Sequence, residues 1–166
     1  MMVDMQLIEL KQSAFTLIEM LVVLAIIAIL ATIAIPNNSN RTVQLQVVES
    51  IDIAENYKAN IEQIYMLTGA FPSNNDDAGL PNSDEIRGNY LAGLRVQNGV
   101  LNLEFGQKMS EQHHGKVLSI RPVFVDSEAI TPISWICGSD TIPEGMLAAD
   151  ENSTTLEEQF LPIRCR

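Results

Sequence analysis

One carboxylate lies near the start of an otherwise apolar segment of this sequence. Glu19 precedes an apolar run from Met20 to Ala31, and the segment from Phe15 to Ile35 contains 21 residues. At about 1.5 Å per residue, a helix of this length is roughly 30 Å long, which matches the hydrocarbon core of a bilayer. A charge well inside such a helix costs roughly 2.5 to 3.5 kcal/mol and calls for a partner or a proton. The segment is therefore predicted to span a membrane, with Glu19 as its chemically informative residue.

Two environments would satisfy Glu19. In the first, it lies at the membrane interface, unpaired and solvated. In the second, the chain is cut before Phe15, and a free α-amino group of opposite charge appears four residues away, one helical turn from the carboxylate. The order of segments favours a cut, because the hydrophobic stretch follows Ala14 and would be retained, whereas a secretory signal has its hydrophobic stretch before the cleavage site.

The two cysteines of the chain are Cys137 and Cys165, and neither has a cysteine or histidine neighbour at zinc-ligand spacing. On an exported domain such a pair predicts one disulfide, which implies a periplasmic or extracellular compartment. The bond would close a loop of about 29 residues and contribute roughly 3 to 4 kcal/mol on the chain-entropy model.

Other chemistry is not indicated. The sequence has no glycine-rich phosphate loop, HExxH motif, GxSxG motif or CxxC motif, so we predict no enzyme, no cofactor and no metal site. His113 and His114 are expected to be exposed to solvent, and the acidic pairs to be solvated surface. Ten basic against 21 acidic residues give a net charge of -11, which disfavours nucleic acid as a specific partner.

The helical part of the chain continues beyond the apolar segment. From Thr42 to Leu67 apolar residues recur every three or four positions, which predicts an amphipathic helix that ends at Gly69. The stripe comprises Val43, Val47, Ile51, Ala54, Tyr57, Ile61, Ile64 and Leu67. Pro36 precedes it and predicts a kink or a melted turn within one long helix, with two separate helices as the alternative.

The remainder predicts a small antiparallel sheet. Residues 71–88 are rich in Pro, Asn, Asp and Gly, which is typical of a surface loop. Apolar segments at 90–96 and 100–105 flank Asn98-Gly99, a strong hairpin signal. A third strand is expected at 116–125, with Pro122 at an edge or bulge, and a fourth at 132–137, with Trp135 in the core. The fold class is therefore α+β, with the helix packed on about four strands.

The segment from Ala14 to Glu19, the apolar helix and Pro36 together closely resemble the N-terminus of type IV pilins. The resemblance implies that a prepilin peptidase cuts between Ala14 and Phe15 and methylates the new amine of Phe15, and it places Glu19 at the acidic position used in filament assembly. Pro36 corresponds to the kinking proline. Ala14 stands where the family usually has glycine, and Ala28 where it has a helix glycine.

The C-terminal part carries a second resemblance. Trp135-x-Cys137 and the terminal Leu161-Pro162-x-x-Cys165-Arg166 look like the disulfide-bounded loop of major-type pilins. The implied organisation is a leader at 1–14, a transmembrane and filament-core helix at 15–36, and a globular domain at 37–166.

The resemblance implies a structural subunit that is held in the inner membrane of a Gram-negative bacterium and then assembled into an extracellular pilus for adhesion, twitching motility or uptake. The implied partners are copies of itself, a prepilin peptidase, the inner-membrane assembly machinery and, before assembly, membrane lipid. The nearest alternative is a minor pilin or a pseudopilin of a type II secretion system. A membrane-anchored enzyme or binding module is a further alternative, and it would need a polar catalytic cluster.

Overall fold

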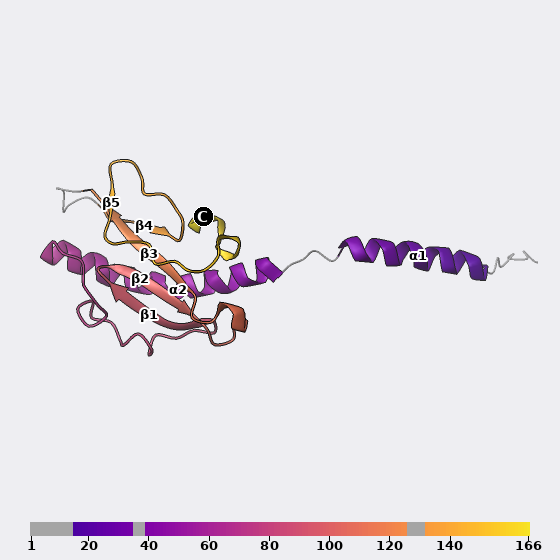
Figure 1. Cartoon of the computed structure of the whole chain (residues 1–166), viewed down its shortest axis with the longest axis horizontal. Helices are drawn as coiled ribbons and strands as arrows, with labels where there is room; N and C mark the ends of the chain where they lie inside the picture. The colour runs from indigo at the N-terminus through magenta and orange to yellow at the C-terminus, as the bar shows by residue number, and fades with distance from the viewer. Residues whose placement is uncertain (1–14, 35–38, 126–131) are drawn as a thin grey trace, which may run out of the picture. The chain divides into compact units, whose positions relative to one another are not determined.

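The structure is a computed structural model that describes residues 15–34, 39–125 and 132–166. Within these ranges, only the backbone is described for residues 33, 34 and 39. The chain divides into two compact units, Met1–Asn37 and Asn38–Arg166. Figure 1 shows helix α1 in the first unit and all other elements in the second. The predicted leader and the kink at Pro36 lie outside the described residues and stay predictions.

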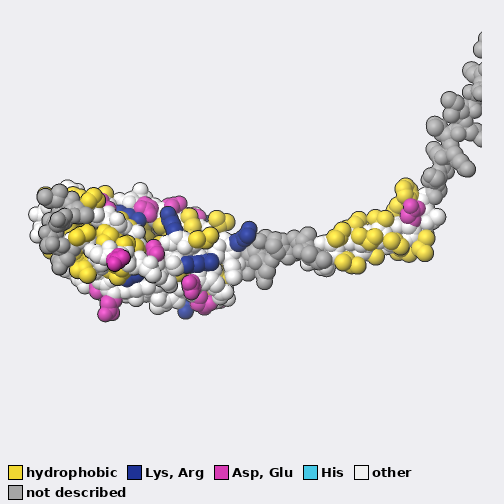
Figure 2. Space-filling model, turned by 90° about the horizontal axis from the view of Figure 1, so that it is seen from above, with side chains coloured by type: hydrophobic (Ala, Val, Ile, Leu, Met, Phe, Trp, Pro, Cys, Tyr) yellow, Lys and Arg dark blue, Asp and Glu magenta, His cyan; other side chains and the backbone are white. Residues whose placement is uncertain are grey.

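Helix α1 (Leu17–Ala34) is apolar on every face. Its large apolar side chains are 44 to 78% exposed, and the face seen in Figure 2 is almost wholly hydrophobic. Glu19, in the first turn, is the acidic residue of this helix. Among the described residues, no helix combines the length and the apolarity that a membrane crossing requires.

Helix α2 (Ser39–Thr68) carries the predicted stripe, which packs on the sheet. Val47, Ala54 and Ile61 are fully buried. Leu67 is an exception, because it is 77% exposed in the last helical turn, where the neighbouring ring of Tyr65 instead stacks on Phe71 at 4.2 Å. The helix ends as predicted at Gly69, which has a φ of 72° and donates its N–H to Tyr65 O.

The sheet has five antiparallel strands, which confirms the α+β class. They are β1 (Leu91–Gln97), β2 (Val100–Phe105), β3 (Val117–Phe124), β4 (Ser134–Cys137) and β5 (Leu147–Ala148). The order is β1-β2-β3-β4, and β5 also pairs with β3. Short 3-10 helices lie at Glu111–His113 (η1), Glu158–Phe160 (η2) and Ile163–Cys165 (η3). The short β5 was not predicted, because two residues within a polar, turn-rich segment leave no periodic signal.

The predicted hairpin is confirmed. Asn98 and Gly99 have φ angles of 47° and 82°, as a two-residue turn between twisted strands requires. The turn is also packed, because a Cβ atom at Gly99 would lie 2.6 Å from Cδ1 of Phe71. Glycine at this position therefore serves both the conformation of the turn and its contact with the segment that follows α2.

Pro122 is not at an edge or bulge, because β3 is paired on both sides. Its carbonyl accepts the Ala149 N–H at 3.1 Å, on the side where pairing with β2 ends at Ile120 and pairing with β5 begins at Val123. The N–H and C=O of a strand residue point to the same side of the strand. The missing N–H of Pro122 would therefore point between β2 and β5, where no described strand needs it as a hydrogen-bond donor.

Residues 71–88 form a loop without helix or strand, as predicted, and this loop covers the outer edge of β1. The side chain of Asn75 donates from Nδ2 to Leu94 O at 3.0 Å and accepts the Val96 N–H at Oδ1 at 2.7 Å. The Leu94 N–H is taken by Ser83 O at 3.1 Å. The side chain of Asn75 and the carbonyl of Ser83 thus bind backbone groups of β1 to which a further strand could otherwise form hydrogen bonds.

Candidate assembly site

The N-terminal end of α1 is formed by a side-chain cap. The Glu19 N–H is 3.3 Å from Thr16 Oγ1 and 3.1 Å from Thr16 O, so threonine satisfies one of the free donors of the first turn. Glu19 itself lies near the positive end of the helix dipole. The pattern Thr16-x-x-Glu19 is a capping-box signal that our sequence analysis missed.

The two predicted processing residues lie at the boundary of the described chain. Ala14 is outside the described residues, whereas Phe15 is described and its side chain is 70% exposed. Cleavage of the peptide bond between them, methylation of Phe15 and pairing of Glu19 with an amine therefore stay predictions. What the structure provides is an apolar helix with exposed side chains that begins two residues after the predicted cut.

A groove on the second unit exposes further apolar side chains. It has a volume of about 730 Å³ and lies between α2 and η3. Leu45 of α2 and Ile163 of η3 line it and are 71% and 87% exposed. Arg41 and Arg164 also line it, together with Asp52. We call this surface the α2–η3 groove. The sequence did not predict it, because its two sides are far apart in the chain.

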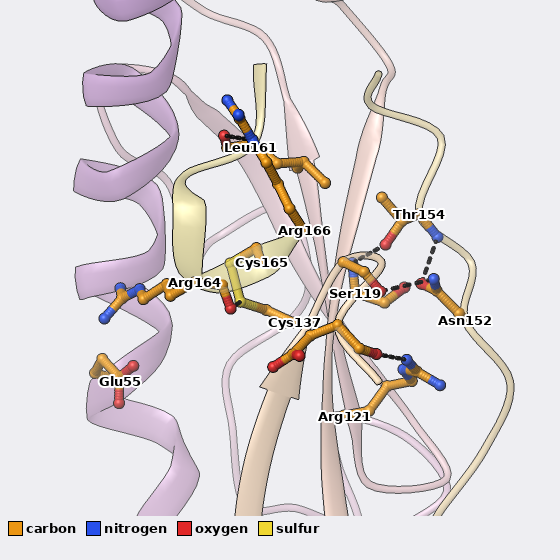
Figure 3. Close-up of a disulfide and its surroundings, with 12 residues drawn as sticks. Glu55, Ser119, Arg121, Cys137, Asn152, Thr154, Leu161, Arg164, Cys165 and Arg166 are labelled. Atoms are coloured by element: carbon orange, nitrogen blue, oxygen red, sulfur yellow. Dashed lines mark hydrogen bonds between the residues drawn. A yellow bond between two sulfur atoms is a disulfide. The ribbon is translucent and has the colours of Figure 1, made fainter. Parts of the chain in front are cut away.

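The two cysteines are joined, as predicted. Cys137, at the end of β4, is bonded to Cys165, in η3, and both are buried. Figure 3 shows the bond between the sheet and α2, with Arg164 reaching toward the helix. Gly138 follows the first cysteine with a φ of 59° and packs so closely on Cys165 that a Cβ atom would clash with its carbonyl oxygen. We call residues 138–164 the disulfide loop.

Hydrogen bonds join the disulfide loop to the backbone of strand β3. Thr154 Oγ1 accepts the Ser119 N–H at 3.0 Å, and the Thr155 N–H donates to Val117 O at 2.9 Å. The buried Arg121 donates from Nη2 to Asp140 O at 3.4 Å (Figure 3). Burial lowers the pKa of Arg121, and the charge of Asp140 acts in the opposite direction.

His113 and Trp135 differ from prediction in how deeply they are buried. His113 is only 2% exposed, because its ring packs edge-on against Phe160 with ring centres 4.4 Å apart. His114, by contrast, is exposed as expected. Trp135 contacts the core but is only partly buried, because β4 lies at the edge of the sheet; its Nε1 donates to Glu62 Oε1 at 2.7 Å. Among residues 15–34, 39–125 and 132–166, no three His, Cys, Asp or Glu side chains cluster as metal ligands.

The fold defines a class of protein in which an exposed apolar helix is joined to a helix-on-sheet domain closed by a C-terminal disulfide. Residues 44–166 match the family model of pilins, described as bacterial filament, and residues 9–35 match the prokaryotic N-terminal methylation motif. The chain therefore belongs to the pilin family, and it is a structural subunit of a pilus.

Curated relatives agree along most of the chain. A fimbrial protein of Neisseria meningitidis serogroup B is 32% identical over 164 residues, covering 93% of this chain and 94% of the relative. The type IV major pilin protein PilE of Neisseria gonorrhoeae is 32% identical over 161 residues, with the same coverage. Fimbrial protein EcpC of Eikenella corrodens is 28% identical over 149 residues, covering 87% and 94%. These likenesses confirm the resemblance to type IV pilins.

Proposed function

We propose that this chain is the major subunit of a type IV pilus of a Gram-negative bacterium. In this proposal a prepilin peptidase removes residues 1–14 and methylates the amine of Phe15. The segment from Phe15 to Ile35 then holds the subunit in the inner membrane until the assembly machinery adds it to an extracellular filament. The observation that carries the proposal is α1, whose exposed apolar side chains need a cover of lipid or protein.

The proposed role of Glu19 is to set the register between copies. In a filament core built from α1 helices, its attraction to the amine of Phe15, its own or that of a neighbour, would be screened far less than in water, although desolvation consumes much of the gain. An axially slipped neighbour would leave one carboxylate without a counter-ion. Pairing therefore favours one axial position over the others.

The first experiment measures the N-terminus and the filaments. Mass spectrometry of sheared filaments is expected to find N-methylated Phe15. Glu19→Ala and Glu19→Gln should both leave the second unit folded but give few or no filaments by electron microscopy at matched subunit levels. Normal numbers of filaments in both variants would refute the electrostatic role. A low abundance of this chain in sheared filaments would favour a minor pilin or a pseudopilin.

The α2–η3 groove is proposed as a second contact, occupied by another copy of this chain. Self-association is the defining property of a filament family, and the exposed Leu45 and Ile163 supply apolar area that water would otherwise cover. Leu45→Asp should reduce filament number without changing the unfolding midpoint. Leu67→Asp is the matched control, because Leu67 is equally exposed on the same helix but lies outside the groove. Equal filament loss in both variants would contradict the groove contact.

No enzymatic activity, cofactor or specific nucleic-acid partner belongs to this proposal. The acidic net charge of -11 supports the last point. A gel shift with the detergent-solubilised full chain tests it, and clear DNA binding at physiological salt would contradict it.

A further inference from the structure

The turn between β1 and β2 contains the only Asn-Gly pair of the sequence, Asn98-Gly99. Asparagine before glycine deamidates readily, because glycine has no side chain to hinder attack by its backbone nitrogen. In that reaction the Gly99 nitrogen attacks Cγ of Asn98, the bond from Cγ to Nδ2 breaks, and ammonia leaves as a succinimide forms. Water then opens the ring to aspartate or isoaspartate, so that the net change is hydrolysis of one amide.

The fold restrains the attacking nitrogen. The Gly99 N–H donates to Pro72 O at 2.8 Å, and the residue is buried. Phe71 covers it closely, since even a Cβ atom at this position would lie 2.6 Å from the ring. Gly99 must therefore lose a hydrogen bond and move from under Phe71 before its nitrogen can reach Asn98 Cγ.

The fold also restrains the group that is attacked. Although Asn98 is exposed, its Nδ2 donates to Asp150 Oδ2 at 2.8 Å, across 52 residues of sequence. The second oxygen of Asp150 accepts the Glu151 N–H at 2.9 Å. These two hydrogen bonds, the backbone one first, lower the pKa of Asp150, which is therefore a charged acceptor at neutral pH.

We propose that Asn98 is a site of slow deamidation whose rate is set by Asp150, and that its conversion detaches the disulfide loop from the hairpin turn. The product replaces the Nδ2 donor by a carboxylate oxygen. Two groups that can only accept hydrogen bonds, and that carry like charges, then face one another where a hydrogen bond had been. The isoaspartate product additionally lengthens the backbone of a two-residue turn. This inference does not depend on the proposed function.

The experiment measures deamidation in the detergent-solubilised full chain. The folded wild type, the same chain denatured and reduced, Asp150→Ala and Glu151→Ala are incubated at mildly alkaline pH and mapped by mass spectrometry, with isoaspartyl methyltransferase to identify isoaspartate. The folded wild type should react at least about tenfold more slowly than the denatured chain. Asp150→Ala should react about three to ten times faster than the wild type, which corresponds to the net contribution of one ordinary intramolecular hydrogen bond at an exposed side chain. Glu151→Ala removes one negative charge from the neighbouring residue, and its deamidation rate should match that of the wild type.

A second measurement tests the consequence without relying on Asp150 variants. Asn98→Asp mimics one product, and it should increase cleavage at Glu151 by a glutamate-specific protease several-fold over the wild type, with Asn98→Ala in between. Three results would overturn the proposal: equal rates in the folded and denatured wild type, an Asp150→Ala rate no faster than that of the wild type, or unchanged cleavage of Asn98→Asp.

Discussion

Reducing the bond between Cys137 and Cys165 removes one crosslink and leaves every side chain in place. The bonded residues are separated by 28 positions, and a closed loop of that size stabilises a domain by roughly 3.5 kcal/mol on the chain-entropy model. Small domains have a total unfolding free energy of about 5 to 15 kcal/mol. We therefore expect the reduced second unit to be much less stable but still folded.

The contacts that keep it folded do not involve sulfur. Thr154 accepts a hydrogen bond from β3 and Thr155 donates one to it, so the disulfide loop is joined to an inner strand of the sheet, and β5 pairs with the same strand. The loop is thus attached along its length as well as at its ends. If those contacts contributed little, reduction would release the whole C-terminal segment.

Urea unfolding of the detergent-solubilised chain, followed by the fluorescence of Trp135, measures the difference. This single tryptophan is partly buried in β4, two residues from Cys137. With a urea dependence of about 1 to 3 kcal/mol per molar, reduction should lower the midpoint by roughly 1 to 3 M. The double variant Cys137→Ala, Cys165→Ala is the control, and reductant should not change its midpoint. An oxidised and a reduced chain with the same midpoint, or a reduced chain unfolded without urea, would refute the reasoning.

Three further predictions use the same chain. Gly138→Ala should lower the unfolding free energy by about 1 kcal/mol or more, and with it the urea midpoint, because residue 138 has a positive φ and a Cβ atom there would clash with Cys165. An unchanged midpoint would contradict the packing described. His113 should make stability depend on pH: burial lowers its pKa, opposed by Glu157, so stability is full above the ordinary value of about 6.5 and falls as acid approaches the folded-state pKa; His113→Phe should lose this slope in unfolding curves measured across pH. Ala14→Gly should raise the mature fraction on immunoblots, since the peptidase site must otherwise accommodate a methyl group.

Features whose signal is local were predictable from the sequence. Asn98-Gly99 specifies its turn because both positions need a positive φ, and the stripe from Val43 to Ile64 specifies the buried face of α2 because helical spacing brings those residues together. The disulfide followed from the number of cysteines.

Features that depend on distant neighbours were not predictable. His113 is buried by Phe160, and no periodicity links two residues so far apart. Pro122 lies inside the sheet because two different partners divide one side of β3. The α2–η3 groove likewise needs the fold, since its two sides come from segments more than 100 residues apart in the sequence.

The covering of β1 by Asn75 has a consequence for how copies of this chain can join. A bare edge strand offers a template on which further strands add, and the cross-β stacks that result are nearly irreversible. A protein that is concentrated in order to polymerise is most exposed to that hazard. Here the Leu94 and Val96 groups are already occupied. Occupied edge groups disfavour the addition of strands, and Asn75→Ala should therefore favour cross-β aggregates at the expense of filaments.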